Sequence, residues 1–475
     1  MKNRTMVAIV SSLIIVLVIS TGVVVVSFLR GPISTDSTTI AIVGHNPTPS
    51  KSVQTDQFIN EFQLPSSLPN AIAVDSSGNV WTVLQNRSAL GVFNPTNDTL
   101  HQYSIPGLST KSPLTSWGIA VNDHTGKVWF AEEISNSIWS FNVETLTFTQ
   151  YSIKTPASNP YEVALDSQGN AWFTEFTGDK LGVVMSNGTM KEYQIPITSS
   201  NPTGIAIDAR TNRIWFNLLD TSGATDEFYV GSFFNGSFTF NDITPEVDTP
   251  VGIAVDSSGN LWLTQHGASL VSEFNPITHY FRTISTSIPP DGASYPYFVY
   301  VDNSTGKIWF NEHYGNAISV FDPKTNNLIE YEIPSRNSGD GNISGALTMT
   351  LTPEGVPWFT ELYTGKIGEV NPSISVGLSI KVSGGSVINL GNQSSTTFQL
   401  LVLNSSNETS YLSASVGNFT GNFVFNFTDF SGHGNYSTIM TLQNAGSAPG
   451  IYFATISAKI QNLIVSQVIE IRCSG

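Results

Sequence analysis

NAWFTE at residues 170–175 is the clearest copy of a tryptophan-centred hexapeptide that recurs seven times along this 475-residue chain. The other copies are NVWTVL at 79–84, KVWFAE at 127–132, RIWFNL at 213–218, NLWLTQ at 260–265, KIWFNE at 307–312 and VPWFTE at 356–361. Consecutive tryptophans of the repeat lie 48, 43, 43, 47, 47 and 49 residues apart, close to the period of about 40 to 50 residues of β-propeller blades. Seven of the nine tryptophans belong to it, so the repeat predicts a seven-bladed β-propeller.

Each repeat reads as four short strands, with the tryptophan strand second and a Ser, Gly or Asn turn before it. The seventh repeat lacks a fourth strand. Residues 60–65, NEFQLP, match the fourth-strand pattern of residues 329–334, IEYEIP, and precede the first repeat. We therefore expect this N-terminal strand to complete the seventh blade, which would close the ring and remove an open sheet edge.

The chain divides into further regions on either side of the propeller, which we place at 58–373. Residues 374–475 alternate apolar and polar side chains in about seven strands, which predicts an Ig-like β-sandwich without the usual cysteine pair. Cys473 is the only cysteine, so no disulfide within the chain is possible. The fold class is therefore all-β, with one N-terminal transmembrane helix.

That helix is predicted from an uncharged apolar run between Met6 and Phe28, preceded by Lys2 and Arg4. The positive-inside rule then gives a cytoplasmic stub at 1–5, a signal anchor at 6–29 and a Ser/Thr/Pro-rich stalk at 30–57. A cleaved signal peptide is the alternative, but the run is long for one and no A-x-A-like site follows it. Everything beyond the anchor would lie outside the cell.

Extracellular exposure is also favoured by twelve Asn-x-Ser/Thr sequons, each a candidate glycosylation site. They are Asn86, Asn97, Asn187, Asn235, Asn303, Asn342, Asn392, Asn404, Asn407, Asn418, Asn426 and Asn435. Sequons at this density with a single cysteine are typical of an archaeal cell envelope. A formal net charge of −16 argues against nucleic acid as a partner.

Two stretches carry a resemblance to a known family, namely NPYEVALDSQGNAWFTEFTGDKLGVV at 159–184 and TPEGVPWFTELYTGKIGEVNP at 352–372. Their blade signature resembles the virginiamycin B lyase, or streptogramin lyase, family of seven-bladed propellers. The resemblance implies opening of a cyclic depsipeptide by β-elimination, with a histidine base in a Pro-His-Gly turn and a magnesium ion held by glutamates. The positions that match that histidine are Asn70, Trp117, Tyr161, Thr203, Val251, Tyr297 and, approximately, Gly345 or Ala346.

None of these is histidine, and the paired glutamate of the family is unmatched as well. The corresponding residues are Leu68, Thr115, Asn159, Asn201, Thr249 and Tyr295. A site could still form where the end of the second strand and the start of the first meet at one mouth of the central channel. Glu132, Glu175, Glu312 and Glu361 end second strands and could hold Mg²⁺ or Ca²⁺, or could belong to the blade signature and bond backbone groups of adjacent blades.

Histidines and aromatic residues complete the candidate site. His266 and His313 follow second strands and could act as general bases if they face the channel, or could be ordinary loop residues. Trp117, Tyr161 and Tyr297 start first strands and could stack on a glycan or a peptide, or could pack between blades. The repeated Asp75, Asp166, Asp208, Asp256 and Asp302 precede turns and are expected to bond turn backbone instead.

Two functions follow from these residues. The first is a membrane-anchored extracellular propeller that binds a ligand, or acts as a scaffold for an unknown surface protein, glycan or peptide. The alternative is a metal-dependent C–O lyase or hydrolase of the streptogramin lyase type at the propeller mouth. The missing Pro-His-Gly turn favours the first.

Overall fold

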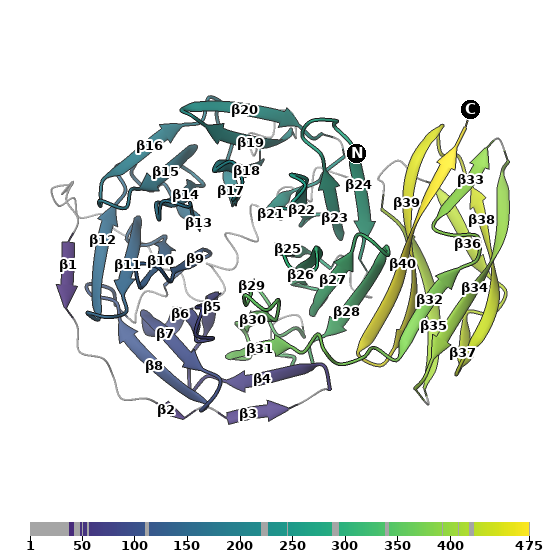
Figure 1. Ribbon diagram of the computed structural model, residues 1–475, viewed down its shortest axis with the longest axis horizontal. Helices are drawn as coiled ribbons and strands as arrows, with labels where there is room; N and C mark the ends of the chain where they lie inside the picture. The colour runs from purple at the N-terminus through teal and green to yellow at the C-terminus, as the bar shows by residue number, and fades with distance from the viewer. Residues whose placement is uncertain are drawn as a thin grey trace.

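The computed structural model describes the strands of residues 38–54 and most of the chain from residue 57 to residue 474. The described ranges are 38–41, 48–49, 51–54, 57–109, 114–219, 227–244, 246–286, 294–337, 342–391, 393–406, 408–417 and 422–474. Within them every regular element is a β-strand except one 3₁₀ turn, Gln85–Arg87. The fold is all-β, and seven sheets of four core strands stand around a common axis (Figure 1).

The strands of each blade follow one another in sequence from the axis to the rim. Blade 1 contains β5 (Pro69–Val74), β6 (Val80–Leu84), β7 (Ala89–Asn94) and β8 (Thr99–Ser104). Blade 2 contains β9 (Ile119–Asn122), β10 (Lys127–Glu132), β11 (Ser137–Asn142) and β12 (Thr147–Ser152). Blade 3 contains β13 (Pro160–Leu165), β14 (Ala171–Glu175), β15 (Lys180–Val184) and β16 (Met190–Gln194).

The remaining blades repeat this order. Blade 4 contains β17 (Pro202–Asp208), β18 (Arg213–Leu219), β19 (Phe228–Phe234) and β20 (Ser237–Asp242). Blade 5 contains β21 (Pro250–Val255), β22 (Leu261–Gln265), β23 (Leu270–Phe274) and β24 (Phe281–Ser285). Blade 6 contains β25 (Pro296–Asp302), β26 (Lys307–Glu312), β27 (Ala317–Asp322) and β28 (Asn327–Glu332).

Blade 7 joins the two ends of the propeller. Its strands β29 (Met349–Leu351), β30 (Pro357–Glu361) and β31 (Lys366–Val370) come from the seventh repeat. Its fourth strand is β4 (Ile59–Gln63), which pairs antiparallel with β31 from Lys366 opposite Gln63 to Val370 opposite Ile59. Asn60 also donates a side-chain hydrogen bond to Glu369, at 3.0 Å. The ring is thus closed by hydrogen bonds between its first and last strands.

The segment before β4 departs from the stalk expected at 30–57. Strands β1 (Thr38–Ala41), β2 (Thr48–Pro49) and β3 (Lys51–Gln54) each add a strand outside a blade. They pair with β12 of blade 2, β8 of blade 1 and β4 of blade 7, respectively. The prediction of a free stalk is therefore wrong for these strands, because unpaired outer blade edges offer backbone hydrogen bonds that a polar, extended segment can take up.

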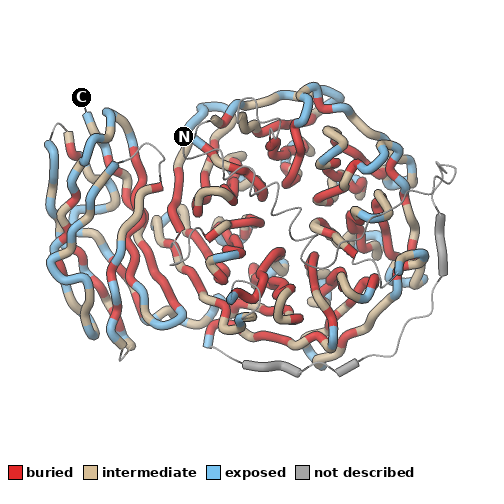
Figure 2. Tube along the Cα trace, turned by 180° about the vertical axis from the view of Figure 1, so that it is seen from behind, coloured by how far each residue is buried: buried red, intermediate tan, exposed pale blue. Residues whose placement is uncertain are grey.

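The strands nearest the axis pack closely and are mostly buried, whereas the rim strands alternate in exposure (Figure 2). A Cβ atom at Gly118 would stand 2.4 Å from the backbone nitrogen of Val163, and one at Gly252 would stand 2.5 Å from the carbonyl oxygen of Tyr297. Glycine is therefore required where the inner strands of adjacent blades approach each other. This contact explains the glycine that opens GIAVN at 118–122 and GIAVD at 252–256.

The C-terminal part contains nine strands in two sheets, more than the seven expected. They are β32 (Leu378–Val382), β33 (Val387–Gly391), β34 (Ser395–Asn404), β35 (Thr409–Val416), β36 (Phe423–Phe427), β37 (Ser431–His433), β38 (Tyr436–Asn444), β39 (Gly450–Ile460) and β40 (Leu463–Cys473). One sheet has the order β32-β34-β38-β36, and the other continues directly from blade 6 because β40 pairs with β28. One apolar cluster that includes Tyr331 of blade 6 and Ile456 of β39 runs across this junction.

Several sequence-based expectations concern residues outside the described ranges. The anchor at 6–29 and the sequons at Asn392, Asn407 and Asn418 lie there. Among the described residues, no helix is long and apolar enough to cross a membrane. Asn404 also stays a predicted glycosylation site; it is 3% exposed, and its amide donates to the Glu408 carbonyl and accepts from Ser406 N.

The other described sequons remain predictions. Those whose asparagine is exposed are Asn97, Asn187, Asn235, Asn303, Asn342, Asn426 and Asn435. Asn86 is half-buried, and its amide donates to the Ser66 carbonyl.

Candidate functional site

A β-bulge shapes the start of the inner strand in five blades. In blade 3, Pro160 pairs with Glu175 and Val163 pairs with Phe173, so the two residues Tyr161 and Glu162 lie opposite Thr174 alone. Equivalent register shifts occur in blades 1, 4, 5 and 6. A bulge turns side chains away from the regular alternation of a strand. It therefore sets the direction of the residues at the mouth of the propeller.

In blades 3 and 5 the residue two places after the tryptophan holds the bulge and links it to the next blade. The hydroxyl of Thr174 accepts a hydrogen bond from Glu162 N and donates to the carbonyl of Thr203 in blade 4. Thr264 makes the same two bonds, to Gly252 N and to the carbonyl of Tyr297 in blade 6. The threonine of the WFTE signature is thus a structural link between blades.

Aromatic residues from three blades meet at the axis. The ring centroid of Trp117 lies 5.8 Å from that of Tyr161 and 5.5 Å from that of Tyr297. The hydroxyl groups of Tyr161 and Tyr297 share a hydrogen bond across the ring. Both tyrosines are buried, so stacking on a ligand is left mainly to the half-buried Trp117 and its neighbour Phe176. The predicted aromatic residues therefore contact one another across the axis, and do not only pack between adjacent blades.

Both predicted histidines point toward this aromatic group. The imidazole of His266 lies 4.9 Å from the ring of Tyr295, 5.1 Å from that of Tyr297 and 6.1 Å from that of His313. Tyr314 contacts His313 at 5.1 Å and, at 37% exposure, carries the cluster to the surface. The group of Trp117, Tyr161, Tyr297, His266, His313, Tyr295 and Tyr314 is called the mouth cluster below.

The imidazoles of the mouth cluster are buried without hydrogen-bond partners. His266 is 5% exposed and His313 is 2% exposed, and all four ring nitrogens lack a partner in the described part of the protein. Burial lowers the pKa of His266 to about 3, with a contribution from His313, and lowers the pKa of His313 to about 4. Two neutral rings with unmet hydrogen-bonding capacity are costly unless a ligand or solvent completes them.

Backbone strain lies at the same place. The residue before the proline of the inner strand has positive φ in blades 3 to 6, at 53° for Asn159, 40° for Asn201, 52° for Thr249 and 50° for Tyr295. Asparagine tolerates this conformation, whereas a β-branched threonine and a bulky tyrosine adopt it at a cost. The carbonyls of Thr249 and Tyr295 accept the backbone N–H groups of His266 and His313. The strained residues therefore fix the two histidines.

The four glutamates predicted to share a metal ion do not come together. Glu132 accepts the backbone N–H groups of Ile134 and Ser135 in its own turn. The carboxyl groups whose charges act on Glu175, Glu312 and Glu361 are Glu192, Glu330 and Glu61, each in the same blade. No group of three or more His, Cys, Asp or Glu side chains within the described ranges is placed to hold a metal ion.

The reason is that the carboxyl groups at the ends of the second strands lie beside groups of their own blades, as Glu132 does beside Ser135 and Glu312 beside Ser319. A shared ion at the mouth therefore has no ligand set among these residues. The alternative, that these glutamates bond backbone groups of adjacent blades, is wrong for Glu132, which accepts N–H groups of its own turn. Glu312 accepts a bond from Ser319 in its own blade.

Sequence reasoning gave little weight to two acids near the axis. Glu133 of blade 2 stands at the position that His266 and His313 hold in their blades, and burial together with Glu132 raises its pKa to about 7. Glu162 lies among tyrosines, accepts the N–H of Ile205, and has a pKa raised by burial to about 8. In the sequence, Glu133 is marked only by its place directly after Glu132. Nothing in the sequence marks Glu162, because its place in the bulge is visible only in the structure.

The repeated aspartates are structural, as expected. Asp166 accepts the backbone N–H groups of Gln168 and Asn170 and the indole N–H of Trp172, each at 2.9 Å. Asp75 and Asp256 make the same set in their turns, ending on Trp81 and Trp262. Asp208 and Asp302 bond their own turns. Each therefore ties a turn to its blade.

Comparisons with known proteins show which family and which solved structures this propeller is similar to. The model of the virginiamycin B lyase family matches residues 50–224. The propeller is virginiamycin B lyase-like. No curated protein matches the chain.

Solved structures agree on the fold of the virginiamycin B lyase-like propeller. A streptogramin B lyase structure superposes with a TM-score of 0.56 at 24% identity, covering 66% of this chain and 97% of that one. A catalytically inactive virginiamycin B lyase from Staphylococcus aureus with quinupristin gives 0.55 at 21% identity, over 66% and 98% of the two chains. Hydrazine synthase from Kuenenia stuttgartiensis gives 0.54 at 9% identity, over 68% and 99%. These likenesses concern the propeller fold alone.

Proposed function

We propose that this protein is a ligand-binding propeller that takes an uncharged, partly aromatic ligand, such as a peptide or glycan, at the mouth cluster. The observation that carries the proposal is the pair of buried imidazoles whose four ring nitrogens have no partner among the described residues. Neutral imidazole both donates and accepts hydrogen bonds, and the adjoining rings offer flat apolar contact. A ligand with amide or hydroxyl groups would satisfy both.

The shifted pKa values of the histidines and glutamates at the mouth indicate which ligand charge the mouth cluster favours. With pKa values of about 3 and 4, His266 and His313 carry no charge near pH 7 and give no net attraction to an anion. Glu162, with a pKa of about 8, is largely protonated there, and Glu133, with a pKa of about 7, is about half protonated, so the two give only limited attraction to a cation. An uncharged ligand therefore matches the cluster.

The proposed setting is the outer surface of a cell. A signal anchor at 6–29 would hold the protein in the membrane, and the exposed sequons would carry glycans. The pairing of β40 with β28 supports a scaffold role, because it joins the C-terminal sheets to the propeller as one surface. The two facing sheets of that part support an Ig-like sandwich in architecture.

Calorimetric titration with quinupristin tests the binding proposal, since that compound was solved with a protein of the same fold. We expect saturable binding without ring opening, which mass spectrometry of the titrated compound would check. Trp117→Ala should abolish the binding, whereas His124→Gln, in an exposed turn, should leave it unchanged. Absence of binding would refute a peptide ligand of this class.

A metal-dependent lyase is the second candidate, favoured by one observation. The Glu133 carboxyl group has a pKa near 7, in the range suited to proton transfer. Against it, neither histidine has a carboxylate partner that would orient its ring. Magnesium-dependent ring opening that is lost in Glu133→Gln would establish the enzyme and displace the binding proposal.

A further inference from the structure

The residue four places after each repeated tryptophan lies at the mouth of the propeller. In every blade its backbone N–H donates to the carbonyl of a residue that leads into the inner strand of the same blade, at N–O distances of 2.8–3.4 Å. Because one kind of bond holds this position in all seven blades, its side chains take equivalent places around the axis. The seven residues, called the mouth ring, are Gln85, Glu133, Phe176, Leu219, His266, His313 and Leu362.

The mouth ring is polar on two opposite sides. Blades 5 and 6 contribute the imidazoles of the mouth cluster, whereas blades 1 and 2, on the other side of the axis, contribute Gln85 and Glu133 (Figure 1). Apolar side chains separate the two polar sides, with Leu362 in blade 7 and with Phe176 and Leu219 in blades 3 and 4. A ligand that crosses the axis from the mouth cluster would therefore meet a second set of polar groups.

Asn70 adds a buried amide to the second polar side. It follows Pro69 in the bulge of blade 1, at the place that Tyr161 and Tyr297 take in blades 3 and 6. Asn70 is 2% exposed. Thr348 donates to its backbone carbonyl, but no described residue bonds to either end of its side-chain amide. A buried amide without partners lowers stability, as the two unpartnered imidazoles do.

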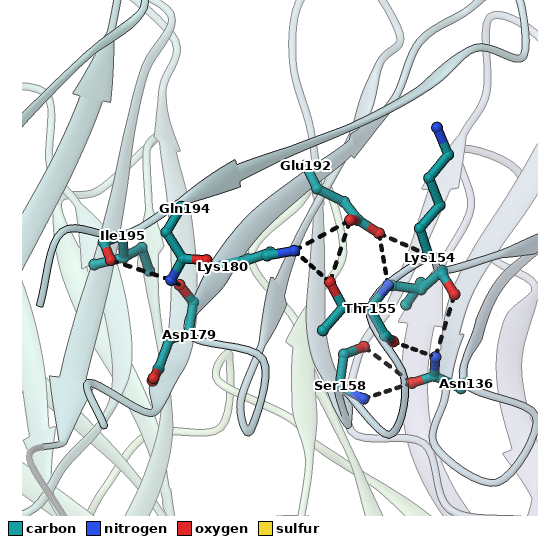
Figure 3. Close-up of polar contacts among 10 residues, drawn as sticks. Asn136, Lys154, Thr155, Ser158, Asp179, Lys180, Glu192, Gln194 and Ile195 are labelled. Atoms are coloured by element: carbon teal, nitrogen blue, oxygen red, sulfur yellow. Dashed lines mark hydrogen bonds and ion pairs between the residues drawn. The ribbon is translucent and has the colours of Figure 1, made fainter. Parts of the chain in front are cut away.

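Structural asparagines of this propeller differ from Asn70. Asn136 of blade 2 donates to the carbonyl of Thr155 at 2.8 Å, and its side-chain oxygen accepts both the backbone N–H and the hydroxyl of Ser158 (Figure 3). Asn170, which is 3% exposed, accepts a backbone N–H and donates to the aspartate of its own turn. Each of these side chains is bonded at both ends and holds a turn or a loop in place.

Three further asparagines resemble Asn70 in part, because their side-chain oxygen also lacks a partner within the described ranges. The amide nitrogens of Asn217 and Asn212 nevertheless donate to groups of the protein. The third, Asn159, is half-buried and leads into blade 3 at the mouth itself. Asn70 is therefore the buried asparagine of the described ranges whose amide is unbonded at both ends.

We propose, on the basis of the ligand binding proposed above, that Asn70 is a second recognition point, which binds the N–H and carbonyl groups of one peptide residue across the axis from His266 and His313. The two ends of its side-chain amide are an acceptor and a donor. One residue of an extended peptide presents its own N–H and carbonyl on the same edge, which complements them. Gln85 and Glu133, both half-buried, supply further polar groups on this side of the mouth.

The apolar parts of the mouth favour a peptide over an unsubstituted sugar. Phe176, Leu219 and Leu362 of the mouth ring and the aromatic rings at the axis lie between the two polar sides. A peptide has polar groups along its backbone and can place apolar side chains beside them. A sugar carries hydroxyl groups around its ring, which the leucines would leave unpaired. The ligand is therefore a peptide with apolar side chains, held by polar groups at two places.

Calorimetric titration of the full chain and of Asn70→Leu with quinupristin tests the proposal, with maltotriose as the probe of a sugar ligand. We expect Asn70→Leu to bind quinupristin at least about tenfold more weakly than the native chain, because it loses hydrogen bonds to the ligand. Without the ligand, the same variant should melt about 1–3 °C higher, because it no longer buries an unpaired amide. Asn70→Ala serves for the affinity if the leucine variant does not fold.

Asn170→Leu is the matched control, because that asparagine is buried to a similar extent but bonded at both ends. It should lower the melting temperature and leave the affinity for quinupristin unchanged. Unchanged affinity in Asn70→Leu, with binding abolished in Trp117→Ala, would overturn this inference and leave the proposed function standing. No binding of quinupristin by the native chain would refute both. Binding of maltotriose that is lost in Asn70→Leu would overturn the peptide as the ligand in favour of a sugar.

Discussion

The two ends of the inner strand differ in what the repeat preserves. At the end that leads into the turn before the tryptophan, Asp75, Asp166 and Asp256 make the same hydrogen bonds in three different blades. At the opposite end the matching residues differ between blades, with three aromatic side chains, one amide, one hydroxyl and one aliphatic side chain: Trp117, Tyr161, Tyr297, Asn70, Thr203 and Val251. The end with the aspartates, called the repeated end, stabilises the blade. The opposite end, called the varied end, also contains the buried imidazoles and the strained backbone, and it can differ between blades to recognise a ligand. The predictions below separate the two.

The largest effect should come from breaking the ring that holds both ends in place. Deletion of residues 58–65 removes β4 and opens blade 7, so we expect the melting temperature to fall by roughly 10 °C or more. Deletion of β3, Lys51–Gln54, is the matched control, because that strand pairs on the outer side of β4 and closes nothing. Equal effects of the two deletions in differential scanning calorimetry would contradict closure by β4.

A smaller loss should follow from a change at the repeated end alone. Asp166→Ala leaves two turn N–H groups and the Trp172 indole without their acceptor, which should lower the free energy of unfolding by about 2–4 kcal/mol. Ligand binding at the varied end should not change. Urea denaturation measures the loss, and a matching loss of binding affinity would mean that the two ends are not independent.

A change confined to the varied end should act through pH. The native rings of His266 and His313 stay neutral down to pH values of about 3 and 4, respectively, whereas the unfolded chain takes up protons below about 6.5. Stability is therefore full above pH 6.5 and falls as the pH decreases toward 4. The double variant His266→Phe, His313→Phe should be more stable than the native chain at pH 5, by up to about 2 kcal/mol per ring. His124→Gln should show no such gain, and an unchanged pH profile in the double variant would mean that the rings are not buried.

The smallest effect should appear on the alkaline side. The pKa of Glu162 is about 8 in the native protein, against about 4.5 for an ordinary glutamate. Because folding raises this pKa, stability is full below about pH 4.5, declines as the pH rises from there to about 8, and is lowest above that. Glu162→Gln keeps an acceptor for Ile205 N and should make the protein more stable at pH 9 by about 1–2 kcal/mol. Denaturation curves at pH 6 and pH 9 would show it, and equal gains at both would exclude titration as the cause.

The fold could be predicted from the sequence because each blade repeats a local pattern, down to the aspartate that bonds the backbone of the turn before the tryptophan. The strand Ile59–Gln63 was also recognisable, since it matches the fourth strand of other blades. The outer strands β1 to β3 were not, because pairing on a blade edge needs only backbone groups and leaves no apolar period.

The site was harder to predict, because it too depends on contacts that leave no local pattern in the sequence. Tyr161 and Tyr297 are 136 residues apart and meet only because the ring brings blades 3 and 6 together. The glutamates were expected to point to the axis, but the direction of a second-strand residue depends on strand pleat and on partners such as Lys366, which a motif does not reveal. Repeats thus predict what is shared by the blades and miss what differs between them.

The most direct test of the account is calorimetric titration of quinupristin into the native chain, Tyr297→Phe and Asp166→Ala. If the varied end binds the ligand and the repeated end only builds the blade, the native chain and Asp166→Ala should bind with equal affinity and leave the compound intact. Tyr297→Phe, which loses the hydroxyl bond to Tyr161, should bind more weakly. Ring opening by the native chain, or affinity lost in Asp166→Ala and kept in Tyr297→Phe, would contradict it.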